Sequence, residues 1–196
     1  DVMQHVFLDV ETKKTFDEVG GFFPEKLGVS FVGIETRDGF SGEAKAQGFF
    51  EDDLPDLFPI LEKADVVVGF NIDGFDMPTM VEYYPGDISQ IPTLDLMGRI
   101  KDSVGHRIGL DDVAQETLGI GKTGDGLDAI KYYNTGQLDK LRDYCLQDVK
   151  VTRQLYDYGL QKGLVKFRNK WNRLITCDVD FSFSPEKENG VQMSLI

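Results

Sequence analysis

The chain has 196 residues, of which 41% are hydrophobic, and this is enough to bury the core of one ordinary globular domain. Its formal net charge of −13 excludes a protein that binds nucleic acid through an overall basic surface, because most of the molecule would repel a polyanion. The sequence shows no apolar run long enough to cross a membrane, no signal-peptide pattern and no zinc-ligand spacing around its two cysteines. We therefore expect a cytoplasmic protein without a structural disulfide.

Apolar patterning and turn signals predict strands and helices that alternate along the chain. The expected elements are strands at Val6–Glu11, Leu27–Glu35, Glu43–Phe50 and Ala64–Phe70, helices at Leu54–Lys63, Leu110–Leu118, Leu127–Tyr133 and Gln137–Leu160, and a final hairpin made of Leu164–Arg168 and Arg173–Val179. Three strands followed by a helix, a strand and further helices predict an α/β fold with a mixed central β-sheet flanked by helices.

The first strand ends in the acidic motif FLDVET, which contains Asp9 and Glu11. Side chains two residues apart on a strand point to the same face, so both carboxylates could hold one cation. The alternative is that they are ordinary polar residues where a strand enters a loop.

A second acidic motif, GFNIDGFD, follows the strand Ala64–Phe70 and contains Asn71, Gly74 and Asp76. Gly74 permits a tight turn, and Pro78 could begin a helix running through Met80 and Tyr83. The alternative is simple turn chemistry, since Asn, Asp and Gly are common loop residues. For the nearby Asp95 we favour a structural role over a place in the site.

The third motif, YCLQD, lies in the helix Gln137–Leu160 and contains Tyr144 and Asp148. Helical spacing places the following residues on one stripe that would face the core: Leu138, Leu141, Cys145, Val149, Thr152 and Leu155 or Tyr156. Asp148 falls inside this stripe and Tyr144 at its margin, and a carboxylate facing the core needs a partner. The alternative is that Asp148 pairs with an arginine and Tyr144 is a boundary aromatic residue.

Taken together, the acidic residues of the three motifs favour a two-metal nuclease site. Cleaving a phosphodiester develops negative charge on several oxygens, and two divalent cations roughly 3.5–4 Å apart can stabilise it. Magnesium and manganese are hard ions that prefer carboxylate oxygens. Clustered carboxylates otherwise repel one another, so a group of four is best explained by cations that neutralise it.

The three motifs resemble those of the DEDD superfamily of 3′–5′ exonucleases over approximately Gln4 to Tyr158. Tyr144 stands four residues before Asp148, as in the tyrosine subgroup, whereas position 143 is Asp and not the His of the histidine subgroup. The middle motif most resembles that of the proofreading exonuclease of family-B DNA polymerases and its stand-alone or helicase-attached relatives. The resemblance implies a ribonuclease H-like fold with a small C-terminal β-hairpin extension.

What the resemblance implies for the site can be stated residue by residue. Asp9, Glu11 and Asp148 would hold one Mg²⁺ or Mn²⁺, with Asp9 bridging to a second ion. Asp76 would complete the site, and Tyr144 would position the attacking water. Three further residues match positions near the terminal nucleotide of the substrate, namely Thr12, Asn71 and Phe75.

The implied substrate is nucleic acid with a free 3′ end, with single-stranded DNA favoured over RNA, and a helicase or polymerase is the implied partner. The expected domain is 1–160, and 161–196 is expected to be a hairpin extension packed on it. Two alternatives stay open: a ribonuclease H-like endonuclease or resolvase, and a non-catalytic metal-binding module that serves a helicase or polymerase.

The predicted C-terminal hairpin carries a run of basic residues without an intervening acid, interleaved with two aromatic residues. They are Lys162, Lys166, Phe167, Arg168, Lys170, Trp171 and Arg173. This composition is suited to gripping a phosphate backbone and stacking a base. The alternative is a solvated hairpin whose aromatic side chains pack on the rest of the domain.

Overall fold

A computed structural model describes residues 2–121 and 124–185. Its strands are β1 (Gln4–Thr12), β2 (Val29–Asp38), β3 (Lys45–Phe50), β4 (Val66–Gly69), β5 (Thr93–Asp95), β6 (Leu164–Arg168) and β7 (Leu174–Asp178). Its α-helices are α1 (Leu54–Lys63), α2 (Met77–Met80), α3 (Leu96–Val104), α4 (Leu110–Leu118), α5 (Gly126–Asn134) and α6 (Leu138–Lys162). A π-helical turn, Ile72–Asp76, leads from β4 into α2.

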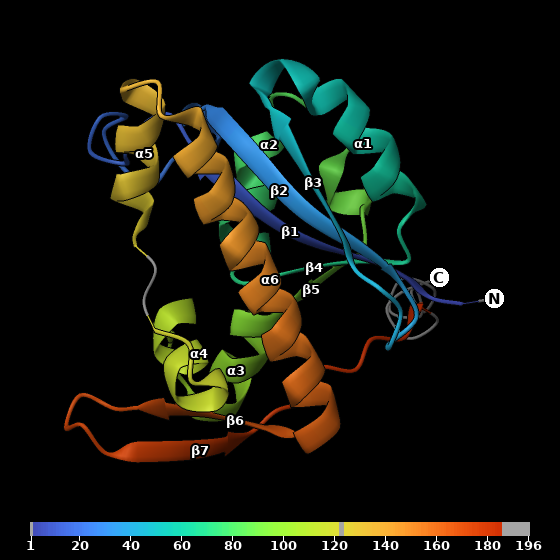
Figure 1. Ribbon diagram of the computed structural model, residues 1–196, viewed down its shortest axis with the longest axis vertical. Coiled ribbons are helices and arrows are strands. Elements are labelled where there is room, and N and C mark those ends of the chain that lie inside the picture. Colours follow the sequence, from blue (N-terminus) through green and yellow to red (C-terminus); the bar gives the residue numbers. More distant parts are fainter. Residues whose placement is uncertain (1, 122–123, 186–196) are drawn as a thin grey trace, which may run out of the picture.

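Five strands form the central sheet in the order β3-β2-β1-β4-β5 (Figure 1). β1 pairs antiparallel with β2 and parallel with β4, so the predicted mixed sheet flanked by helices is confirmed. Parallel neighbours require a crossover, which α1 supplies before β4 and α2 before β5. β2 extends to Asp38, beyond the predicted end at Glu35, because Asp38 pairs with Gln4 at the start of β1.

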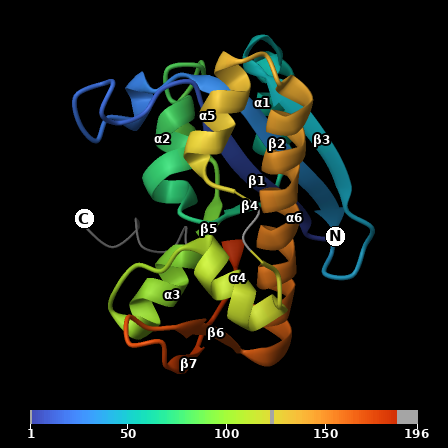
Figure 2. The ribbon, with the colours of Figure 1, turned by 60° about the vertical axis from the view of Figure 1, so that its left-hand side comes forward.

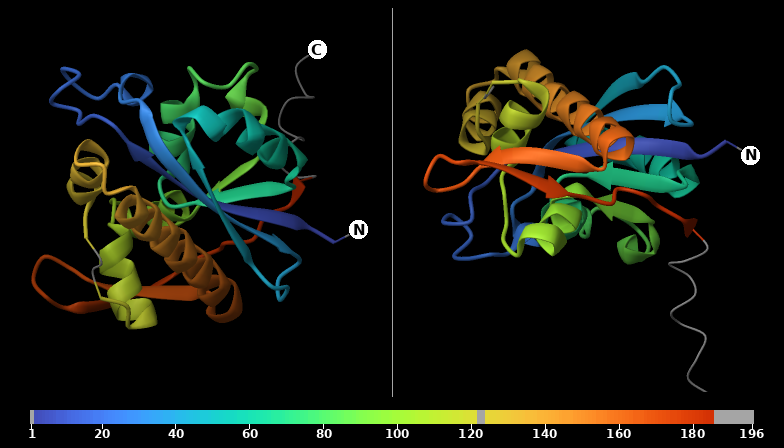
Figure 3. Two further views of the ribbon diagram at one scale, coloured as in Figure 1. Left: turned by 45° about the horizontal axis from the view of Figure 1, so that its top comes forward. Right: turned by 90° about the horizontal axis from the view of Figure 1, so that it is seen from below.

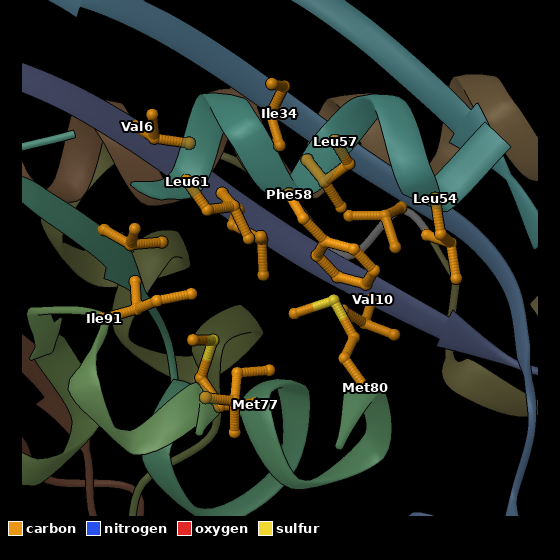
Figure 4. Packing of buried hydrophobic residues seen from close by; sticks show 14 of the residues in the cluster. Val6, Val10, Ile34, Leu54, Leu57, Phe58, Leu61, Met77, Met80 and Ile91 are labelled. Carbon is orange, nitrogen blue, oxygen red and sulfur yellow. The ribbon is translucent and has the colours of Figure 1, made fainter. Parts of the chain in front are cut away.

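The central strand β1 divides the core between the two faces of the sheet. Val6 and Val10 join α1 and α2 in one cluster of buried residues (Figure 4), whereas Phe7 belongs to a second cluster with α3, α4 and α6. Successive side chains of a strand point to opposite faces. The next two side chains on the Phe7 face are Asp9 and Glu11, so the alternation directs both carboxylates toward α6.

The long helix α6 lies across the strands on this second face (Figure 3). Its buried residues include the predicted stripe from Leu141 onward, together with Val151 and Gly159, which the prediction did not contain. The full set is Leu141, Cys145, Val149, Val151, Thr152, Leu155, Tyr156 and Gly159. The stripe begins at Leu141, whereas Leu138 in the first turn is exposed. α5 packs beside the first half of α6 (Figures 1 and 2), and Ala129 of α5 shares a buried cluster with Leu141.

Gly33 of β2 permits the close approach of α6 to the sheet. A Cβ atom at this position would lie 3.0 Å from the Sγ of Cys145 and 3.2 Å from a methyl group of Val149. Gly33 pairs with Asp9 in the register of β1 and β2. The absence of a side chain at Gly33 therefore sets how near α6 comes to the Asp9 carboxylate.

β6 and β7 form a separate antiparallel hairpin, as predicted, and the hairpin is attached to α4. The hydroxyl of Thr117 donates to the carbonyl of Lys166 over 2.9 Å and accepts from its backbone N–H over 2.8 Å. Phe167 is buried in the core, whereas Trp171 in the hairpin loop is 69% exposed. The division into 1–160 and 161–196 stays a prediction, and residues 186–196 of the second segment lie outside the described residues.

The elements β5 and α3 lie in a stretch for which the sequence patterns predict no element. β5 has three residues, which is too short for an alternating pattern, and it becomes a strand by pairing with β4. Asp95 then caps α3, because its carboxylate accepts a hydrogen bond from Gly98 N over 3.2 Å. It also accepts from Asn71 N over 2.8 Å, so the structural role expected for Asp95 is observed.

The helix predicted to run from Pro78 through Tyr83 is shorter than expected. α2 ends at Met80, and the Tyr83 hydroxyl accepts from Val29 N over 3.0 Å. Pro85 follows closely, and a proline disfavours helical backbone at the residue before it. The helix therefore ends before it reaches Pro85.

Candidate functional site

Asp9 and Glu11 lie at the end of β1 and share the face that α6 covers. Glu11 is buried and Asp9 is half-buried. The Sγ of Cys145 on α6 lies 3.4 Å from both the backbone oxygen and the Oδ2 of Asp9. One ligand atom from each of these three side chains lies within 4.8 Å of the other two. β1 and α6 therefore place the polar side-chain atoms of Asp9, Glu11 and Cys145 close together.

Asp76 reaches the same region from the π-helical turn that follows β4. β1 and β4 pair only as far as Phe7 and Val68, so the backbone N–H of Val10 on that side has no strand partner. The Oδ1 of Asp76 accepts a hydrogen bond from this N–H over 2.8 Å. Asp76 is 2% exposed, and its hydrogen bond joins the turn to β1, the strand that carries Asp9.

The sharp turn before Asp76 depends on Asn71, whose φ of 62° lies in the left-handed region. Asn tolerates this conformation better than most residues. Gly74 lies close to its side chain, since a Cβ on Gly74 would be 2.7 Å from the Oδ1 of Asn71. Asn71 and Gly74 therefore both shape this turn, and it is this turn that presents Asp76 to β1.

Tyr144 and Asp148 lie one turn apart on α6, and both are half-buried. Their side chains line a cavity of about 500 Å³ between the end of β1, α5 and α6. The cavity lining also includes Asp9, Glu11, Thr12 and Phe75. Two residues predicted for the site are not part of this lining: Asp76, which is hydrogen-bonded to Val10 N, and Asn71, whose N–H donates to Asp95.

Burial raises the pKa of every carboxyl group in this cluster. It raises the pKa of Asp9 to about 6, and together with the negative charge of Asp9 it raises that of Asp148 to about 8. Burial and the charge of Asp9 also hold the pKa values of Glu11 and Asp76 well above their usual range. Removing several carboxylates from water without compensation disfavours their charged forms. A positive charge placed among these four carboxyl groups would therefore stabilise their charged forms.

The donor atoms fit a hard divalent cation. Within residues 2–121 and 124–185, none of the four carboxylates forms an ion pair with a Lys, Arg or His side chain. The alternative of a buried pair between Asp148 and an arginine is thus not observed among these residues. Burial raises the pKa of the Cys145 thiol, which keeps its proton and donates to Asp9. Carboxylate oxygens are the ligands that Mg²⁺ and Mn²⁺ prefer.

Sequence reasoning missed an aromatic row that leads out of the cavity. Phe16 lines the cavity beside Phe75, with ring centroids 6.0 Å apart, and stacks on Phe22 with centroids 4.7 Å apart. Phe22 is 67% exposed. The sequence indicates only a loop here, and the available signal was the presence of several phenylalanines in a polar, glycine-containing segment.

The fold and the carboxylate-lined cavity define a ribonuclease H-like α/β protein. A sequence model of the RNase H superfamily matches residues 6–159, and the chain belongs to this superfamily. Membership supports a nuclease-type function, a nucleic-acid substrate and the use of divalent metal. The comparison with curated proteins gave no significant match. Among the described residues, no helix is long and apolar enough to cross a membrane.

Among solved structures, the chain is similar to the family B DNA polymerase from the hyperthermophilic archaeon Pyrobaculum calidifontis. The TM-score is 0.57 and the sequence identity is 21%. The match covers 81% of this chain and 24% of the polymerase chain, so this chain spans about a quarter of the length of that protein. At this identity the similarity shows a shared fold.

Proposed function

We propose that the chain is a metal-dependent 3′–5′ exonuclease that releases nucleoside 5′-monophosphates, with single-stranded DNA as its favoured substrate. The observation that carries this proposal is the meeting of three separate motifs in one place. Asp9 and Glu11 come from β1, Asp148 and Tyr144 from α6, and Asp76 from the turn hydrogen-bonded to β1. This set, in this order, is the one that characterises the tyrosine subgroup of DEDD exonucleases.

In the proposed site, Asp9, Glu11 and Asp148 would hold one divalent cation, and Asp9 would also contribute to holding a second. Two such cations, when bound, stabilise the negative charge that develops on the attacking and leaving oxygens of a phosphodiester. Asp76 completes the surroundings of the second position while its Oδ1 stays hydrogen-bonded to Val10 N. Cations bound in place of protons would lower these pKa values, so the electrostatics of the four carboxyl groups support the proposed use of metal.

Tyr144 positions the attacking water. Burial and the negative charge of Asp148 raise the pKa of the Tyr144 phenol far above its usual value, so the Oη keeps its proton at neutral pH. A protonated phenol donates one hydrogen bond and accepts another. It can therefore orient a water molecule beside Asp148.

The cavity supplies contacts for the 3′-terminal nucleotide. Its volume of about 500 Å³ is within the usual range for small-ligand sites. Phe75, which Phe16 contacts edge-on, would stack on a base, and Thr12 would contact the same nucleotide from the cavity wall. Asn71 does not line the cavity and would approach this nucleotide from the adjoining turn. The net charge of −13 makes the affinity modest and strongly salt-dependent, which a nuclease acting on a few terminal nucleotides can tolerate. A cytoplasmic role beside a helicase or polymerase is part of this proposal.

The test is digestion of a 5′-labelled single-stranded DNA oligonucleotide and its RNA counterpart, with Mn²⁺, Mg²⁺ or chelator. We expect a ladder that shortens from the 3′ end and depends on metal. Asp148→Asn should abolish the ladder, whereas Asp143→Asn should preserve it. Asp143 is the matched control because it loses the same charge from the same helix at an exposed position.

Two other results would contradict the proposal. Cutting of closed circular DNA, lost in Asp148→Asn, would identify an endonuclease or resolvase. Metal-dependent thermal stabilisation with no cleavage of any substrate would identify a non-catalytic metal-binding module.

A further inference from the structure

A second cavity, of about 510 Å³, lies between the α3–α4 loop and the loop of the β6–β7 hairpin. Arg107 and Asp112 line it from the α3–α4 side, and Lys170 and Trp171 line it from the hairpin side. These segments lie at the lower end of the molecule in Figure 1, with α4 above the hairpin. We call this the hairpin cavity.

The hairpin cavity has a local excess of positive charge on a strongly acidic protein. Arg107 and Lys170 are exposed, and neither forms an ion pair with another residue in the described part of the chain. Arg168, in contrast, pairs with Glu116 over 2.8 Å. The whole chain carries a net charge of −13, so unpaired cations at one place make a local site for an anion.

Trp171 gives this cavity a stacking surface. It is 69% exposed, although the Nζ of Lys170 lies 4.4 Å from its ring centroid. The loop that carries it is held in shape by Asn169, whose Oδ1 accepts from Trp171 N and Arg173 N, each over 3.0 Å. Phe167 packs into the core, so the hairpin keeps one aromatic residue inside and presents the other.

The first turn of α4 lies between the hairpin cavity and the carboxylate cavity. The negative charge of Asp111 contributes to the raised pKa values of Asp148 and Tyr144, so Asp111 lies within electrostatic reach of that cluster. The next residue, Asp112, lines the hairpin cavity. Neighbouring residues of α4 thus relate to the two cavities, since Asp112 lines the hairpin cavity and the charge of Asp111 acts on Asp148 of the carboxylate cavity.

We propose that the hairpin cavity binds the upstream part of the same single-stranded nucleic acid whose 3′ end occupies the carboxylate cavity. Trp171 stacks on a base, and Arg107 and Lys170 contact phosphates. The proposal rests on the exonuclease function proposed above. A single strand fits these observations because it combines aromatic faces with regularly spaced negative charge, and both features match this surface.

Trp171 is the single tryptophan of the sequence, so its fluorescence reports on the hairpin cavity alone. The titration uses Asp148→Asn protein, which leaves the substrate intact, and oligonucleotides of about 20 nucleotides made of DNA or RNA. We expect saturable quenching that weakens as salt rises. Equal quenching by an acidic peptide of the same charge would overturn the proposal and indicate a protein partner.

Cleavage by the otherwise unchanged protein gives the second measurement. The substitutions Trp171→Ala and Lys170→Ala together should lower kcat/KM about tenfold on a strand of about 20 nucleotides and leave that on a trinucleotide unchanged. The matched control is Phe40→Ala with Lys63→Ala, which also removes one exposed aromatic residue and one exposed lysine, from the β2–β3 turn and from α1.

The two proposals fail in different ways. If the chain cuts DNA from the 3′ end but the fluorescence does not change and the double variant matches the control, the hairpin cavity proposal is overturned and the exonuclease stands. If Trp171 fluorescence is quenched and the double variant binds a labelled oligonucleotide about tenfold more weakly by fluorescence anisotropy, but no variant cuts, the binding surface stands and the exonuclease does not.

Discussion

Replacing Gly33 with alanine tests whether the contact between β2 and α6 positions the carboxylate cluster. The added Cβ would lie 3.0 Å from Cys145 Sγ and 3.2 Å from both Leu146 Cδ2 and Val149 Cγ2. All three neighbours belong to α6, so the helix must move outward by a few tenths of an ångström to restore ordinary contacts. Cys145 also contacts the carboxylate of Asp9, so the shift separates the strand and helix halves of the site.

The magnitude follows from two opposing effects. Overpacking a core by one methyl group destabilises by about 1–3 kcal/mol. Replacing glycine by alanine stabilises by about 0.4–1 kcal/mol through the unfolded chain. The net loss lies between about zero and about 2.6 kcal/mol, which lowers Tm by up to about 10 °C for a chain of this length. Because a misplacement of about 1 Å can cost about 100-fold in rate, a smaller shift of Asp148 should lower cleavage about tenfold.

The measurements are Tm by thermal unfolding, the further rise in Tm with Mn²⁺, and the rate of oligonucleotide cleavage. Gly121→Ala is the control, because a Cβ there would have no atom of the described residues within 4 Å and its backbone is not left-handed. Gly33→Ala protein with unchanged Tm, Mn²⁺ response and rate would show that Gly33 does not set the approach of α6. A fall in Tm with full activity would show that the cluster tolerates the shift.

Two further predictions concern the charge of the cluster. At pH 8.5, Asp148→Asn should raise the Tm of the metal-free protein, because it removes a buried negative charge beside Asp9. The same substitution should reduce the rise in Tm that Mn²⁺ produces. A lower Tm of the metal-free variant would contradict this explanation. For pH, the pKa of Asp9 is raised to about 6 and that of Asp148 to about 8, from a usual value near 4. The folded protein therefore binds more protons than the unfolded chain between these values, so stability without metal should fall as pH rises from about 4 to about 8. Mn²⁺ competes with these protons, so the stabilisation that it gives should grow over the same pH range. Denaturant unfolding at several pH values, with and without Mn²⁺, measures how stability depends on pH in each case. A stabilisation by Mn²⁺ that does not change with pH would refute this prediction.

Local patterns in the sequence were sufficient for most of the fold. Alternation along β1 and the helical stripe of α6 are encoded residue by residue, because strand and helix periodicity follow from backbone geometry alone. β5 could not be predicted in this way, since three residues carry no period and Thr93–Asp95 becomes a strand through its partner β4. The length of α2 was also mispredicted, because Tyr83 is used instead to bind Val29 and Glu51.

The sequence by itself determined that Asp9 and Glu11 share a strand face and that Asp148 lies in a buried helical stripe, because each of these statements needs only local periodicity. Only the tertiary structure decided that the strand and the helix meet, since that depends on Gly33 and Cys145, which are far apart in the chain. It also decided that Asp76 binds the backbone of β1, because β4 ends early and leaves the N–H of Val10 for a side chain. The raised pKa values arise from burial, which is a property of the packed molecule and cannot be present in any single motif.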